Sequence, residues 1–519
     1  MLILLLLTAA LADLPIHCTF KQLLGEWEFV LNSDTFESSL DNPKTYCGHG
    51  QPGKILSLDK DEEFHFEKSF KTSVVFEEPN YAYSPEYGAG TWTLIYDEGF
   101  ILEFPDKTFT NYFFYYKQGY SYKTNCGRTT IGWYRSGDSK DKSSWGCFFA
   151  EKKTLVELSD SSMPDINWVS PEYMSFIQVS NKYYEDYQDQ VNHINSVQSS
   201  WTAELNPKFK GMTMMQLNQK VGKKQRVVTA DIVKPNIPDV SKYKDFDFSR
   251  LSKIDDDSLA YFWDVPSEAI PSEALPDHWD WSDINGVSYV TDKVRDQGNC
   301  GSCYAITTVE MLESRLRVLT NNKFKDYLSE QYLLSCSFYT EGCDGGYPTL
   351  LNKFIQEFGV IKDECMKYKA QEIECHTECK SKEKVGVSKY YYIGGYYGAT
   401  DEESMMKELR ARGPLIADFK PESEYMFYRN GIYTSISHRS PDMFISDDSM
   451  RDYNIDWEKV THSSLLVGWG EENGEKYWKC LNSWGMDWGE NGYFRIKRGV
   501  DESAIESMGE AAVPYLIRD

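Results

Sequence analysis

The chain has 519 residues, which is enough for two or three domains. Its formal net charge is −25, from 80 acidic and 55 basic residues, and this argues against a nucleic-acid partner because phosphate binding needs a basic surface. After the N-terminus no run approaches the roughly 18 apolar residues of a membrane helix, so no membrane span is expected.

The first segment, residues 1–12, has the pattern of a secretion signal. Residues 2–7 are its apolar centre, and Ala-Leu-Ala at 10–12 fits a cleavage site with two small residues. No Lys or Arg precedes the apolar centre, so a buried N-terminal strand stays open as the alternative.

Residues 13–155 are rich in aromatic residues and glycine. Strand-like pieces at 54–58, 90–96 and 110–116 alternate with short polar turns, and this pattern predicts an antiparallel β-barrel. An even number of cysteines, enough for two bridges, falls in this region. They are Cys18, Cys47, Cys126 and Cys147.

Residues 156–274 are more polar and contain few glycines. An amphipathic helix is expected within 174–201, and the segments 233–238 and 266–276 have the composition of extended linkers. We interpret the region as a propeptide that packs on the domain after it and is later removed. An ordinary helical connector is the alternative.

The most informative motif is Gln-Gly-Asn-Cys-Gly-Ser-Cys-Tyr at 297–304. The run 304–316 has apolar residues at helical spacing and no Gly or Pro, so it predicts a helix with Cys303 in its first turn. The partial positive charge at a helix N-terminus favours a thiolate. Gln297 could bind an oxyanion through its side-chain amide. The motif therefore predicts that Cys303 is a nucleophile.

Two later segments supply partners for the thiol. A predicted strand at 461–470 carries His462, and another at 477–485 has Asn482 near its end. We expect His462 to take the thiol proton and later to protonate the leaving amine. Asn482 would orient the imidazole, and Trp484 would shield their hydrogen bond from water. The order Cys, His, Asn resembles that of papain-like cysteine proteases.

Three further features concern this second half of the chain. Residues 438–460 are polar and acidic and predict a loop insertion before the histidine. Gly345 and Gly346 would let the backbone of an extended substrate approach closely. The chain has 12 cysteines. With Cys303 as nucleophile an odd number is left, so one must be unpaired, and Cys480 is the best candidate.

Nearly all of the chain after residue 12 resembles the cathepsin C, or dipeptidyl peptidase I, family of papain-like peptidases. The segments that carry the resemblance are 13–27, 200–203, 394–398 and 498–507. It implies an α+β protein with a β-barrel exclusion domain at 13–155 and a helical propeptide at 156–274. A peptidase domain of two lobes, one helical and one a β-barrel, would follow at 275–519. Its heavy chain would start at about 275 and its light chain within 438–460.

The resemblance implies a cysteine exopeptidase that removes dipeptides from the free N-termini of peptides and proteins. Signal cleavage would expose Asp13, whose carboxylate would bind the substrate ammonium while the barrel blocks the cleft beyond two residues. A solvated Asp13 is the alternative. An activating protease, assembly as a homo-tetramer, and a lysosome or another acidic secretory-pathway vesicle, or secretion, are implied as well.

The resemblance also implies the disulfide pairing and an anion site. The pairs are Cys18–Cys126, Cys47–Cys147, Cys300–Cys343, Cys336–Cys375 and Cys365–Cys379, which leaves Cys303 and Cys480. A chloride ion would bind at the base of the pocket for the second substrate residue, with Tyr347 and Tyr392 at liganding positions. Thr349 departs from the family pattern, in which a Tyr stands there. No metal ion is expected.

Two other functions stay open. The chain could be a papain-like endopeptidase whose barrel only regulates it. Gly25-Glu26-Trp27 is similar to the Gly-x-Trp start of lipocalins, so a non-enzymatic protein that binds an apolar ligand is the second alternative. That alternative leaves Cys303, His462, Asn482 and Gln297 unexplained.

Overall fold

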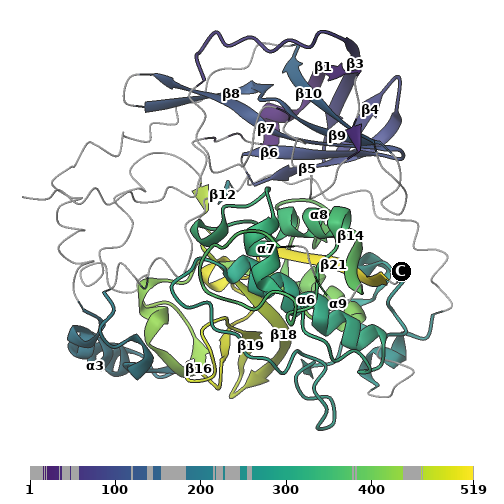
Figure 1. The fold of residues 1–519 in the computed structure, drawn as a ribbon. Helices are drawn as coiled ribbons and strands as arrows, with labels where there is room; N and C mark the ends of the chain where they lie inside the picture. The colour runs from purple at the N-terminus through teal and green to yellow at the C-terminus, as the bar shows by residue number, and fades with distance from the viewer. Residues whose placement is uncertain are drawn as a thin grey trace, which may run out of the picture.

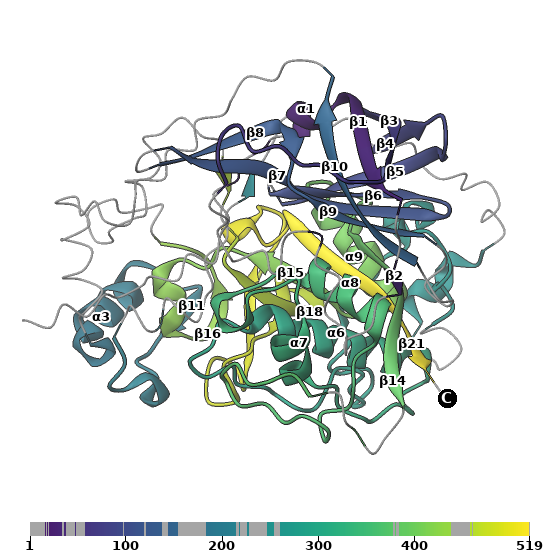
Figure 2. The ribbon, with the colours of Figure 1, turned by 45° about the horizontal axis from the view of Figure 1, so that its top comes forward.

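A computed structural model describes most of the chain. The described residues are 16, 18, 20–33, 36–37, 47, 58–96, 98–118, 121–136, 144–153, 183–213, 217, 226–227, 246–253, 260–376, 379, 383–436, 457–458 and 460–517. They form a β-barrel and a larger body of helices and sheet, and both ribbon views place the barrel along one side of the larger body (Figures 1 and 2). Within these ranges no helix has the length and apolar character needed to cross a bilayer.

The barrel is antiparallel, and its strands follow the order β1-β3-β4-β5-β6-β7-β8-β10, with β10 pairing back to β1. Inward-facing side chains alternate along β1, which buries Trp27, Phe29 and Leu31. Phe29 stacks on Phe109 with 5.4 Å between ring centroids. The strands are β1 (Gly25–Asn32), β2 (Phe36–Glu37), β3 (Ser69–Glu77), β4 (Tyr81–Ser84), β5 (Gly88–Ile95), β6 (Gly99–Phe104), β7 (Lys107–Gln118), β8 (Ser121–Thr129), β9 (Gly132–Ser136) and β10 (Ser144–Lys152), after a short helix α1 (Phe20–Leu23).

The larger body contains a sheet in the order β11-β16-β20-β19-β18-β15-β21-β14, with β13 paired to β18. Helix α6 packs against β18 and β21, so the long apolar helix and the sheet share one core. The strands are β11 (Trp201–Ala203), β13 (Trp279–Asp280), β14 (Lys384–Tyr392), β15 (Leu415–Phe419), β16 (Tyr428–Tyr433), β18 (His462–Glu472), β19 (Glu475–Leu481), β20 (Tyr493–Lys497) and β21 (Met508–Ile517). The helices are α3 (Gln188–Val197), α6 (Cys303–Leu319), α7 (Glu330–Cys336), α8 (Pro348–Phe358) and α9 (Glu402–Arg412).

This architecture confirms the predicted α+β class, with a barrel before a helix-and-sheet body. Of the predicted strands, 90–96 falls on β5 and 110–116 on β7, while all but the last residue of 54–58 lies outside the described residues. The five disulfides of the structure are the pairs that the resemblance implies, and they are Cys18–Cys126, Cys47–Cys147, Cys300–Cys343, Cys336–Cys375 and Cys365–Cys379.

The helix expected within 174–201 is shorter in the structure. Helix α3 spans Gln188–Val197 after a 3-10 turn, and the part of the prediction before residue 183 lies outside the described residues. Trp201 belongs instead to strand β11, which pairs with β16. Its indole is buried against Tyr433 and donates a hydrogen bond to the carbonyl of Thr434. Tertiary packing of one aromatic residue therefore overrides the helical pattern at this end.

The predicted loop insertion at 438–460 falls mostly outside the described residues. Within it, Trp457–Glu458 forms a short strand, β17, that pairs with β12 (Arg226–Val227) of the expected propeptide region. The expectation of a pure loop is therefore wrong for these two residues, because their backbone groups pair with a distant segment.

Candidate active site

Cys303 is the first residue of helix α6, as the motif predicts. Its side chain is 5% exposed and lies in a pocket that it shares with His462. The backbone N–H groups of a first helical turn have no partner within the helix, so they give the thiol a positive environment. This position therefore favours the thiolate form on which nucleophilic attack depends.

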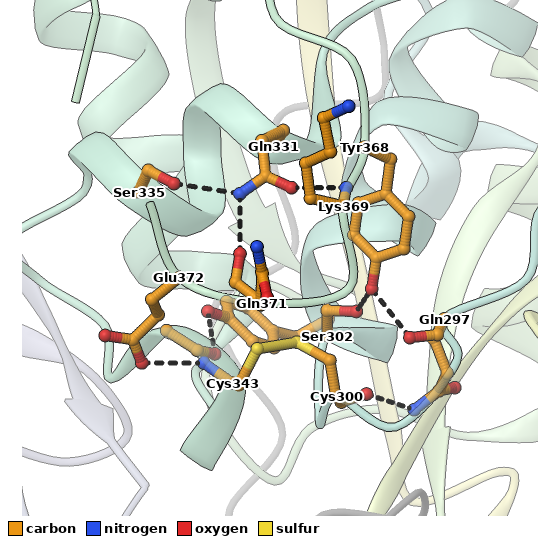
Figure 3. The surroundings of a disulfide bond; sticks show 12 residues. Gln297, Cys300, Ser302, Gln331, Ser335, Cys343, Tyr368, Lys369, Gln371 and Glu372 are labelled. Atoms are coloured by element: carbon orange, nitrogen blue, oxygen red, sulfur yellow. Dashed lines mark hydrogen bonds between the residues drawn. A yellow bond between two sulfur atoms is a disulfide. The ribbon is translucent and has the colours of Figure 1, made fainter. Parts of the chain in front are cut away.

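The loop before the helix is held rigidly on both sides (Figure 3). The Cys300–Cys343 disulfide ties it to a neighbouring loop, and the Gly301 amide donates to the Cys343 carbonyl at 2.8 Å. On the other side, the Tyr368 hydroxyl donates to the backbone carbonyl of Gln297 at 2.8 Å and bonds the Ser302 hydroxyl. These contacts fix the start of the helix and with it the position of the nucleophile.

His462 opens strand β18, and Asn482 directly follows β19, the strand paired with β18. The imidazole Nε2 lies 2.7 Å from the amide Oδ1 of Asn482. An amide oxygen only accepts, so Nε2 carries the proton and Nδ1 presents a lone pair. Nδ1 is buried and has no hydrogen-bond partner among the described residues. Nδ1 is therefore the atom that can accept a proton in the pocket that also holds Cys303.

Burial controls the protonation of this imidazole. Removal from water lowers the pKa of His462 to about 4, and the hydrogen bond to Asn482 opposes that shift. The ring of Trp484 lies 5.3 Å from the imidazole ring, between centroids, and its side chain is 1% exposed. Trp484 therefore keeps water away from the pair, as the sequence predicts, and contributes to the low pKa.

Gln297 is fully buried next to the loop that leads to Cys303. Its Oε1 accepts from the Ser483 hydroxyl at 2.6 Å and from the Trp484 indole N–H at 3.1 Å. Its Nε2 donates to the Cys300 carbonyl at 2.9 Å. Two donors on the oxygen fix the amide orientation, so the amino group faces the nucleophile loop, where an oxyanion donor is needed.

Gly345 and Gly346 line the same pocket. A Cβ at Gly346 would lie 2.3 Å from the Tyr304 ring, and Gly345 has a φ of 131°, which favours glycine. The protein's own packing and backbone conformation therefore require glycine at these two positions. Because glycine has no side chain, the backbone at the edge of the pocket can be approached by a substrate.

The barrel and a buried strand supply two pocket residues that the sequence analysis missed, Tyr96 and Asp418. Tyr96 follows β5, and its hydroxyl lies 3.2 Å from Asp418 and 3.4 Å from Glu510. The sequence does contain a signal for Asp418 and Glu510, because each is a charged residue within an otherwise apolar strand, β15 for Asp418 and β21 for Glu510. Such a residue inside a buried strand is a candidate for function.

The hydroxyl groups that the resemblance assigns to a chloride ion, those of Tyr347, Tyr392 and Thr349, lie close to carboxyl groups. The Tyr347 hydroxyl donates to the carboxyl of Glu98 at 2.7 Å. The Tyr392 hydroxyl is buried beside Glu510, and burial raises the pKa of that tyrosine. Thr349 also lies next to Glu510, whose pKa is raised by burial and by Asp418, while the Thr349 hydroxyl opposes that shift. Two of the three hydroxyls therefore already face carboxyl groups, and the chloride site stays a prediction.

Asp13 and Cys480 are the two remaining positions that the sequence analysis singles out. Asp13 lies outside the described residues. Cys480 is fully buried within β19 and outside the disulfides, and burial raises the pKa of its thiol. It is therefore a structural residue in an apolar setting rather than a second nucleophile.

Comparisons with known proteins agree with this geometry. Residues 275–513 match the papain family cysteine protease, and residues 13–152 match the cathepsin C exclusion domain. The chain is 30% identical over 513 residues to cathepsin C of Schistosoma mansoni, covering 97% of this chain and 96% of that protein. It is 24% identical over 659 residues to dipeptidyl aminopeptidase 1 of Plasmodium falciparum, covering 96% and 93%.

Among solved structures, digestive procathepsin L 3 from the larval midgut of Tenebrio molitor matches with a TM-score of 0.45 and 22% identity, over 67% of this chain and 94% of that one. The relative from Schistosoma mansoni spans both the exclusion domain and the protease. The chain therefore belongs to the cathepsin C family of papain-like cysteine proteases.

Proposed function

We propose that this chain is a cysteine exopeptidase that removes dipeptides from the free N-termini of peptides and proteins. The observation that carries the proposal is the position of Tyr96. This barrel residue lines the pocket of Cys303 and His462 and contacts the protease residues Asp418 and Glu510. A cleft closed by a second domain next to the nucleophile admits only the end of a chain.

The groups of the pocket account for the hydrolysis step by step. Nδ1 of His462 takes the proton of Cys303, and the thiolate attacks the carbonyl carbon of the second substrate residue. The Gln297 amide and the backbone N–H of Cys303 receive the oxyanion. The imidazolium then protonates the leaving amine, which leaves a thioester on Cys303. Water, activated by the neutral imidazole, hydrolyses the thioester and releases the dipeptide.

Asp13 is our proposal for the group that binds the substrate ammonium. The described chain that follows it is anchored to the barrel, because Cys18 is bonded to Cys126 and Phe20 lies 4.7 Å from Trp92 of β5, between ring centroids. Strand β5 leads directly to Tyr96. Five residues of extended chain span at most about 18 Å, and this limits how far Asp13 can lie from Cys18.

Maturation by an activating protease completes the proposal, with removal of the propeptide between about 156 and 274 and a cut within 438–460. Part of the propeptide region covers the site in the full chain. Lys208 contacts Asp296 and the Trp484 carbonyl, both at 2.5 Å, and Phe209 packs on the Trp484 ring. Its removal would uncover this side of the catalytic residues. From the family we also propose that the protein assembles as a homo-tetramer. Its proposed location is a lysosome or another acidic vesicle of the secretory pathway, or outside the cell after secretion.

Digestion of an unmodified peptide of about ten residues by the processed protein tests the activity. We expect mass spectrometry to show successive loss of two residues from the N-terminus of the peptide. Internal fragments that appear first would instead identify the alternative, an endopeptidase with a regulatory barrel.

A further inference from the structure

The pocket beside the catalytic residues ends in buried carboxyl groups. Strand β15 is buried along its whole length and contains one charged residue, Asp418. That side chain lines the pocket together with Cys303 and His462. A buried carboxyl group in contact with a substrate pocket is costly unless a partner satisfies it, so its presence requires an explanation.

A second carboxyl group lies next to Asp418. Strands β15 and β21 are antiparallel neighbours with Ile416 opposite Glu510, so Asp418 and Glu510 are diagonal neighbours on one face of the sheet. Glu510 is fully buried. Its Oε2 accepts no hydrogen bond of normal geometry from the described residues, although the Thr349 hydroxyl lies near enough to lower its pKa.

The hydroxyl groups around this pair are arranged for an ionised Asp418. The Ser463 hydroxyl donates to its Oδ1, and the Tyr96 hydroxyl lies 3.2 Å from its Oδ2. Burial and the charge of Asp418 raise the pKa of Glu510 well above its usual value, so Glu510 holds a proton. Asp418 is the member of the pair that lines the pocket, and the two hydroxyl groups at its oxygens favour its ionised form.

The position of the carboxyl pair determines which residue of the substrate it can contact. The residue that contributes the scissile carbonyl must lie at Cys303, and the residue before it lies one step nearer the barrel. Tyr96 closes the pocket at that end and contacts both carboxyl groups. In a dipeptidyl peptidase that preceding residue is the N-terminal one, so its side chain faces Asp418.

We propose that Asp418, supported by Glu510 and Tyr96, makes this pocket select a cationic side chain, lysine or arginine, at the N-terminal position of the substrate. The inference rests on the proposed dipeptidyl activity and adds its specificity. A cationic side chain would form a charge-assisted hydrogen bond with Asp418. An aliphatic side chain would remove the carboxylate from water without adding a hydrogen bond to it, and an acidic side chain would be repelled.

A panel of fluorogenic dipeptide amides with free N-termini tests the proposal on the processed wild-type protein. Alanine is kept at the second position, and the first residue is lysine, arginine, norleucine or glutamate. Norleucine has the linear shape of lysine but no ammonium group. We expect kcat/KM for lysine and arginine to exceed that for norleucine roughly 10- to 100-fold, with glutamate the poorest.

The variant Asp418→Asn assigns the preference to one residue. We expect the lysine-to-norleucine ratio of kcat/KM to fall about tenfold, with each preparation normalised by titration of the reactive thiol. Glu424→Gln is the matched control, because Glu424 is an equally buried carboxyl that bonds Ser435 and the Ile436 amide and does not line the pocket. Its lysine-to-norleucine ratio should equal that of the wild type.

The wild-type panel alone decides the matter if the variant does not fold. Equal or faster cleavage of the norleucine substrate would overturn the cationic preference while leaving the dipeptidyl activity intact. Cleavage of acetylated and free forms at the same rate would instead overturn the proposed function, and the inference with it. A lysine preference that persists in Asp418→Asn would show that another group binds the cation.

Discussion

The Tyr96 hydroxyl of the barrel and the Asp418 carboxylate of the protease lie 3.2 Å apart, although 322 positions separate them in the chain. The Tyr96 ring also packs on Tyr347, with 3.9 Å between centroids. Tyr96 and Asp418 both line the pocket of Cys303. The barrel is therefore a wall of the substrate pocket and not merely a neighbouring domain.

Removal of the Tyr96 hydroxyl should weaken substrate binding without breaking the fold. Tyr96→Phe keeps the ring contact with Tyr347 but removes a hydrogen bond from a buried carboxyl, so we expect kcat/KM on a free-amine dipeptide amide to fall about 5- to 30-fold. Tyr134→Phe is the matched control. It removes a barrel hydroxyl that donates to the Asn32 carbonyl, away from the pocket, and should leave kcat/KM unchanged. Equal effects of the two variants would place the loss in barrel stability instead.

The buried imidazole predicts the acid limb of the pH profile. Burial holds the pKa of His462 at about 4, so the ring is neutral above that pH and able to take the Cys303 proton. We expect kcat/KM to fall as the pH drops through about 4, because an imidazolium cannot act as a base. An acid limb near the ordinary histidine pKa of about 6.5 would contradict this account.

Asn482 offers a control for that assignment. Its hydrogen bond raises the pKa of His462 against the effect of burial. In Asn482→Ala the acid limb should therefore move to lower pH, while kcat falls roughly a hundredfold because the ring loses its orientation. A limb that stays in place would mean that another group titrates there.

The two cysteines outside the disulfides should differ in reactivity. Cys303 lies at a helix N-terminus in the pocket, whereas Cys480 is fully buried, and its raised pKa keeps it a thiol. We expect iodoacetamide to modify one thiol in the folded, processed protein and two after unfolding without reduction. Peptide mapping should place the first label on Cys303. Modification of Cys480 in the folded state would contradict the packing of β19.

Chloride should not be needed for activity. The Tyr347 hydroxyl donates to Glu98, and Thr349 lies beside Glu510, so two of the hydroxyls that the resemblance assigns to an anion already face carboxyl groups. We expect kcat/KM to be the same in chloride and in acetate at equal ionic strength. Activity that is lost on dialysis and restored by chloride alone would contradict this and support the implication of the resemblance.

The catalytic residues could be predicted from the sequence because each is set by a short segment. Cys303 begins a helix, His462 begins a strand, and Asn482 directly follows one, so local patterns place all three. The acidic pocket could not be predicted in this way. It depends on Tyr96 meeting Asp418 and Glu510 across 322 and 414 positions, and no local pattern encodes such a contact.

The misjudged end of the expected helix at 174–201 has a similar cause. Trp201 fits the helical spacing, but its buried contacts with Tyr433 and Thr434 draw the backbone into a strand beside β16. The departure from the family at the base of the pocket was visible in part, since Thr349 stands where a tyrosine was expected. Only the fold brings Glu510 of β21 beside Thr349 of α8, so the local sequence could not indicate this contact.

One comparison tests the central claim most directly, namely hydrolysis of a single dipeptide amide with its amine free and then acetylated, by the processed protein at mildly acid pH. The account predicts that the free amine is cleaved and the acetylated form is not, because the barrel closes the pocket behind the first residue. Equal rates on both would show an open cleft, and the role assigned to the barrel would be wrong.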